Sequence, residues 1–171
     1  MKNIILSIVV LILFITTLGC PPIKKKEPLA PERATHVRRT ISTWLESEEC
    51  MEGTLEAVVE LGEAAVPSLA AVLREGPSPA NLEQLRLHLI ANYQKLKEYQ
   101  ETHRDAQVPM SQKMYVNTYL DNYIALNQSR AAIALGKIGG EDAKKALEQA
   151  LKAPLRKDVI NVVADSWRKV Q

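Results

Sequence analysis

The stretch RAAIALGKIGGEDAKKALEQAL, residues 130–151, decides the fold of this chain. It holds a helix rich in small residues, a Leu-Gly step at Gly136, a short Gly-Gly turn and a second helix with an apolar stripe. Glycine often adopts the left-handed conformation that ends a helix, and Gly136 and Gly139 can both take it. The pattern predicts a pair of short helices whose shared apolar face needs a stacked neighbour.

Outward from this stretch, the rest of the chain from about residue 32 is also predicted to be helical. Alanine, leucine, lysine, glutamate and glutamine dominate, and no run alternates apolar and polar residues as a strand would. Glycine and proline mark the turns between helices. We expect an amphipathic helix over 37–45, a short pair over 55–73, two long helices over 81–103 and 111–138, and two short helices at the end.

The segment LGEAAVPSLAAVL, residues 61–73, repeats the order of the first stretch: Leu-Gly, a short turn and an apolar helix. Both segments resemble HEAT repeats, especially the short bacterial kind with the motif RAAxALGxIG, found in the lyase-type HEAT proteins. The residues that match are Arg130, Ala131, Ala132, Ala134, Leu135, Gly136, Ile138 and Gly139, with Leu61, Gly62, Ala65, Val66, Pro67 and Leu69 in the first copy. Residues 163–170 look like the first helix of a further repeat.

This resemblance implies an all-α fold, a HEAT-like stack or short α-solenoid. Residues 81–128 depart from the repeat pattern because their two helices are too long for it. We therefore expect them to form a long helical hairpin that is inserted into the repeats or replaces some of them. The predicted domain boundaries are 1–19, 20–31 and 32–171, with the HEAT-like α-helical domain in the last range.

The first 19 residues have the order of a secretory signal peptide: Lys2, a long apolar run and a small residue, Gly19, before Cys20. The sequence TLGC resembles the lipobox of bacterial lipoproteins, although its first two positions depart from the usual Leu and small residue. The resemblance implies cleavage before Cys20 and attachment of acyl chains such as palmitate to Cys20. It places the protein at a bacterial cell-envelope membrane, facing the periplasm or exterior. A plain membrane anchor, or an ordinary signal peptide with a chance cysteine, is the alternative.

Residues 20–31 form a tether in this interpretation, because proline lacks the N–H that a helix interior needs. The segment also contains three consecutive lysines, 24–26. The whole chain has 22 basic and 20 acidic side chains, and the predicted signal peptide removes only one charge. A nucleic-acid-binding domain normally carries a clear basic surplus. We therefore expect no nucleic-acid partner.

All five tyrosines fall on the two predicted long helices: Tyr93, Tyr99, Tyr115, Tyr119 and Tyr123. The last three are four residues apart and share one helix face. Tyrosine combines an apolar ring with a polar tip and is favoured at binding surfaces. These tyrosines are the candidate partner-binding residues. The alternative is that their rings fill the seam of the hairpin itself.

No catalytic, metal-binding or phosphate-binding motif is found in the sequence, and its three histidines lack metal spacing. We therefore predict no enzyme activity and no cofactor. The leading hypothesis is a membrane-anchored lipoprotein that acts as a scaffold or adaptor for an unidentified protein partner. HEAT-like repeats also occur in bilin lyases, where they cradle a chromophore. The alternative function is thus a ligand-binding or modifying protein, with a small-molecule pocket between hairpin and repeats.

Overall fold

A computed structural model of the protein describes residues 29–46, 52–103 and 109–171. In these ranges all regular structure is helical and no strand occurs, which confirms the all-α prediction. The predicted signal peptide, Cys20 and residues 21–28 of the tether lie outside the described residues. The elements are α2 (Pro31–Glu46), α3 (Glu52–Glu60), the 3-10 turn η1 (Gly62–Ala64), α4 (Val66–Glu75), α5 (Pro79–Thr102), α6 (Gln112–Ile138), α7 (Gly140–Ala150) and α8 (Lys157–Arg168).

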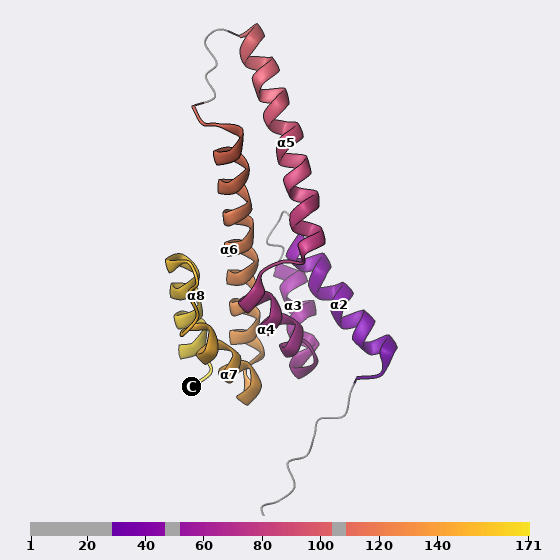
Figure 1. The fold of residues 1–171 in the computed structure, drawn as a ribbon. Coiled ribbons are helices and arrows are strands. Elements are labelled where there is room, and N and C mark those ends of the chain that lie inside the picture. Colours follow the sequence, from indigo (N-terminus) through magenta and orange to yellow (C-terminus); the bar gives the residue numbers. More distant parts are fainter. Residues whose placement is uncertain (1–28, 47–51, 104–108) are drawn as a thin grey trace, which may run out of the picture.

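Helix α6 is the central element of the molecule (Figure 1). It contacts α3, α4, α7 and α8 in the body, and it also contacts α5. Its C-terminal half carries the small side chains of the main core, and Ala131, Ala132, Ala134 and Leu135 are completely buried. Small residues let neighbouring helices approach closely, which explains how one helix packs against four others in the body.

The two long helices form the expected hairpin. Figure 1 shows α5 and the N-terminal half of α6 extending beyond the other helices. A separate small cluster holds them together, with Leu89, Val116 and Leu120 buried at its centre. The hairpin therefore has its own apolar seam, distinct from the core of the body.

Local sequence signals set the ends of the long helices. The Ser78 hydroxyl caps α5 by accepting a hydrogen bond from the Asn81 N–H at 3.2 Å, and Pro79 occupies the first turn. The Ser111 hydroxyl caps α6 by accepting from the Met114 N–H at 3.3 Å, as the sequence predicted. Gly139 ends α6 with φ of 67°, a conformation that glycine adopts without strain.

Gly136 does not take the left-handed, helix-ending conformation that its motif allows, and α6 continues to Ile138 as predicted. Gly136 lies inside α6, and its φ is not positive. A Cβ atom at Gly136 would lie 2.9 Å from the Ser166 Cβ and 3.1 Å from its Cα. Gly136 therefore serves the close approach of α8 to α6. In the first copy, by contrast, Gly62 has φ of 57°, so the two Leu-Gly steps are not structurally equivalent.

Arg130 fastens α2 to the body. Its side chain is buried, and one guanidinium nitrogen, Nη1, donates to the Leu45 carbonyl at 2.9 Å and the Trp44 carbonyl at 3.3 Å. These carbonyls belong to the last turn of α2, where the helix has no N–H groups of its own to offer. A cation is also favoured at this negative end of the helix dipole. Arg130 thus holds α2 across α6.

Candidate functional site

Four of the five candidate tyrosines follow one another in space along the hairpin. The fifth, Tyr99, lies apart from them. The ring of Tyr93 is 5.5 Å from that of Tyr115, which is 4.6 Å from the ring of Tyr119. Tyr123 follows one turn later on α6. Tyr99 instead stacks on His103 at the end of α5, with ring centroids 3.9 Å apart.

The sequence allowed two interpretations of the tyrosines, as a partner-binding surface or as the seam of the hairpin. The structure assigns some tyrosines to each. Tyr93 is only 7% exposed, and its hydroxyl donates to the Met110 carbonyl at 2.8 Å, so it belongs to the seam. Tyr115 is half-buried beside it. Tyr119 and Tyr99 are 49% and 54% exposed. The exposed rings are accessible to a partner, and the half-buried Tyr115 and Tyr123 are partly accessible.

The side chain of Tyr123 lines a groove at the base of the hairpin. The groove has a volume of about 360 Å³ and lies between α2, α4, α6 and the start of α5. Its floor is mainly apolar and its rim is polar. The residues that line it are Arg38, Ile41, Ser42, Leu45, Glu46, Ser68, Ala71, Val72, Pro77, Ser78, Asn81, Tyr123 and Asn127. This volume lies within the usual range for small-ligand sites, about 300–1,000 Å³.

The Glu46 carboxylate is fixed at one end of the groove. Its Oε1 accepts from the Ser42 hydroxyl at 2.7 Å and from the Asn81 side-chain amide at 3.0 Å. Both donors are neutral, and no ion pair to Glu46 occurs within the described residues. Burial raises the pKa of the Tyr123 hydroxyl above its ordinary value, and the charge of Glu46 raises it further. The carboxylate of Glu46 therefore places a negative charge at one end of the groove.

Asn127 is a buried polar residue in the lining of the groove, and the sequence offered it as an asparagine that could satisfy a buried polar group or bind a ligand. It is only 1% exposed, and its amide nitrogen donates to the Tyr123 carbonyl at 2.8 Å on the same helix. A buried side-chain amide normally has a hydrogen-bond partner, and one that lies among apolar alanines needs an explanation. It faces the groove floor. The signal in the sequence was a polar residue at a position whose helical neighbours, Ala131 and Ala134, belong to the core.

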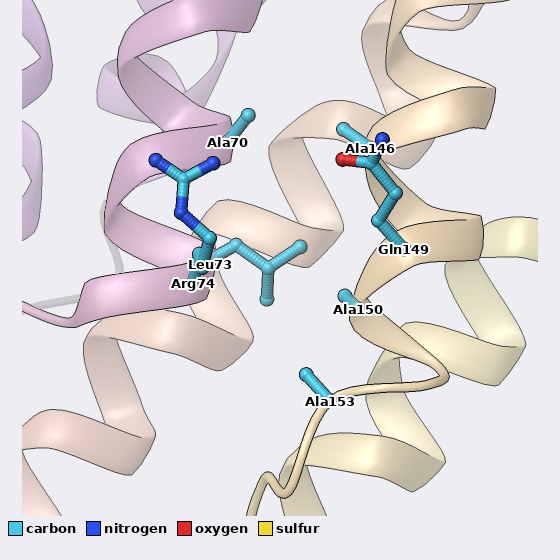
Figure 2. A pocket seen from close by; sticks show the side chains of 7 residues that line it. All are labelled: Ala70, Leu73, Arg74, Ala146, Gln149, Ala150 and Ala153. Atoms are coloured by element: carbon cyan, nitrogen blue, oxygen red, sulfur yellow. The ribbon is translucent and has the colours of Figure 1, made fainter.

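A second, much smaller cleft lies between α4 and α7 (Figure 2). Ala70 and Leu73 line one side and Ala146 and Ala150 the other, and its volume is about 80 Å³. Arg74 and Gln149 flank it. This space is well below the usual size of a small-ligand site, so the groove at the hairpin base is the stronger candidate.

The part of the chain that the structure describes contains no cluster of three or more histidine, cysteine or acidic side chains placed to hold a metal ion. None of the helices in this part is long and apolar enough to cross a membrane. The described helices therefore form an all-α protein that has a compact body, a projecting hairpin and an amphipathic groove where the two meet. No family model, curated protein or solved structure matches the chain.

Proposed function

We propose that this protein is a membrane-tethered adaptor that binds a protein partner through the junction of its hairpin and body. The observation that carries the proposal is the groove beside Tyr123, with the exposed ring of Tyr119 one turn above it. Tyrosine rings next to a concave apolar surface are typical anchors of protein interfaces. The partner surface in this proposal is thus narrower than the full set of five tyrosines.

The helix contacts support a repeat-like stack as the scaffold. Helix α6 contacts α3 on one side and α8 on another, while α4 contacts α7. In a HEAT-like stack, successive first helices adjoin one another and so do successive second helices. We interpret α3 with α4, α6 with α7, and α8 as such a series, with the α5 hairpin inserted after the first pair.

The anchor in this proposal is lipid on Cys20. Two or more acyl chains suffice for stable membrane attachment, since each buried CH₂ adds about 0.8 kcal/mol. The sequence then leads through the tether to α2, which begins at Pro31, so the groove would lie close to a bacterial envelope membrane.

The test is crosslinking and affinity purification of the lipidated protein from its own cells, followed by mass spectrometry. A partner should be recovered with the wild type and lost with Cys20→Ala. Tyr119→Glu should reduce recovery about tenfold or more, because an interface tyrosine is a frequent hot spot. Tyr99→Glu is the matched control: it alters an exposed tyrosine of the same hairpin away from the groove, and recovery should persist.

Circular dichroism and thermal unfolding of each variant separate lost binding from lost folding. Unchanged recovery with a folded Tyr119→Glu variant would overturn the proposed surface. Recovery that is unaffected by Cys20→Ala would overturn the tethered adaptor.

The groove also favours a second candidate function, a small-molecule binding protein, because it lies where that alternative required a pocket, between hairpin and body. Mass spectrometry of the intact protein purified under native conditions would reveal a co-purifying small molecule. Its loss with Ala71→Phe, which fills the groove, would establish this function in place of the adaptor.

A further inference from the structure

We infer that the groove at the hairpin base receives a short segment of a protein partner in which an apolar side chain adjoins a lysine or arginine. This inference rests on the proposed adaptor function and names the chemistry of its partner. The structural basis is an apolar floor that ends at a fixed carboxylate, Glu46.

The shape of the groove suits one or two side chains. Ile41 and Leu45 from α2, Val72 from α4 and Pro77 provide apolar walls, and the volume of about 360 Å³ exceeds that of a single large side chain. The polar groups are at the rim and at single points of the floor, which is the usual composition of a specific binding site. An apolar side chain would enter the floor while its backbone passes the rim hydroxyls of Ser42 and Ser78.

The charge at the Glu46 end selects a cation. Ser42 and Asn81 both donate to Oε1, so neither occupies Oε2 of Glu46. Glu46 is also the last residue of α2, where the helix dipole is negative, and Arg130 is engaged with the carbonyls of that turn.

The opposite end of the groove carries Arg38, eight residues earlier on α2. At a rise of about 1.5 Å per residue the backbone positions of Arg38 and Glu46 are roughly 12 Å apart along the helix. No ion pair to Arg38 occurs within the described residues. The groove therefore has a polarity, and a bound segment would place its basic side chain at the Glu46 end.

The experiment uses the purified full chain in non-ionic detergent, with empty micelles as the blank. Three acetylated, amidated tetrapeptides serve as probes: Ala-Phe-Lys-Ala, Ala-Phe-Glu-Ala and Ala-Ala-Lys-Ala. Binding is followed by NMR through the side-chain amides of Asn81 and Asn127, which both line the groove. The first peptide should shift both signals in a saturable manner, and the other two should bind more weakly.

Two variants test the assignment. Glu46→Gln keeps an oxygen acceptor for Ser42 and Asn81 but removes the charge. It should weaken the lysine peptide about two- to fivefold, the range expected for a solvent-exposed ion pair, and abolish the preference over the glutamate peptide. Ala71→Phe should weaken the lysine peptide more than tenfold by filling the groove. Ala57→Phe, on the exposed face of α3, is the matched control and should leave binding unchanged.

Equal binding of the lysine and glutamate peptides to the wild type would overturn the inference. So would a preference that survives Glu46→Gln, or binding that survives Ala71→Phe in a variant with an unchanged circular dichroism spectrum. If these results appear while Tyr119→Glu still abolishes partner recovery, the adaptor function stands and only the chemistry of the segment is wrong.

Discussion

The two halves of α6 illustrate two ways of holding helices together. The C-terminal half lies in the body, where Ala131, Ala134 and Leu135 have no exposed surface and four helices surround it. The N-terminal half packs against α5 in the hairpin, through a small cluster around Leu89 and Leu120. Since stability comes mainly from buried apolar surface, the body should be the stable unit and the hairpin the more readily opened one. The groove lies where the two meet.

The largest test of this comparison removes one leucine from the core of the body and one from the seam of the hairpin. Leu135→Ala should lower the free energy of unfolding by about 2–5 kcal/mol, because it leaves a cavity in a fully packed core. Leu89→Ala should cost about 2 kcal/mol or less, and hydrogen exchange should accelerate in the hairpin alone. Chemical denaturation and exchange mass spectrometry measure the two effects. Equal, global effects of both substitutions would mean that body and hairpin form one cooperative unit.

Arg130→Met tests the fastening of α2 to the body. It leaves the Trp44 and Leu45 carbonyls without their long-range donor, so we expect a loss of about 1–3 kcal/mol in the free energy of unfolding. Lys137→Met, an exposed position on the same helix, is the control and should change stability by less than about 0.5 kcal/mol. An equal loss in both variants would rule out the specific role of Arg130.

Gly136→Ala tests the close contact of α6 and α8. Alanine favours a helix by about 1 kcal/mol over glycine, yet its Cβ would meet Ser166 at 2.9 Å. Overpacking costs about 1–3 kcal/mol, so we expect a net loss of about 1 kcal/mol in a thermal or urea melt. A variant more stable than the wild type would show that α8 can shift away from α6 at little cost in free energy.

Tyr93→Phe probes the hairpin more gently. Loss of the hydrogen bond to the Met110 carbonyl should cost about 0.5–1.5 kcal/mol, seen as faster amide exchange near the start of α6. Tyr99→Phe is the control, because no hydrogen bond to the Tyr99 hydroxyl occurs within the described residues. Identical exchange in both variants would contradict a structural role for Tyr93.

The smallest effect concerns a surface pair at the start of α8, beside the hairpin base. Arg156 binds both oxygens of Asp158, at 2.7 and 2.6 Å, and donates to Asn122 of α6 at 2.8 Å. The hydrogen bonds from Arg156 lower the pKa of Asp158 from 3.8 to about 2. Because this pKa is depressed, any stabilisation by the pair is present above about pH 4 and is lost as the pH falls toward 2.

A carbon-13 NMR titration of the carboxyl should show Asp158 ionised at pH 3, and Arg156→Gln should return its midpoint toward 3.8. A wild-type midpoint already at the ordinary value would contradict the pairing. The charges are fully solvent-exposed, so we expect little change in overall stability.

The sequence by itself determined the helices and most of their ends. Ser111 and Gly139 bound α6 as predicted, because a cap is formed by a residue and its near neighbours in the chain. The apolar spacing also predicted the buried face of α2, including Val37, Ile41 and Trp44. The secretory signal and the lipidation of Cys20 remain predictions from sequence, outside the described residues.

Only the tertiary structure decided how these helices use their side chains. Gly136 matched a helix-ending motif, yet it spaces α6 from a helix some thirty residues later in the chain. Arg130 finds its acceptors 85 and 86 residues away, and the groove combines three stretches that are distant in sequence, within 38–46, 68–81 and 123–127. Helical periodicity and capping depend on neighbours within about one turn, whereas contacts between helices depend on which faces meet. That is why the sequence could name five candidate tyrosines, whereas the fold places only Tyr123 among them in the lining of the groove.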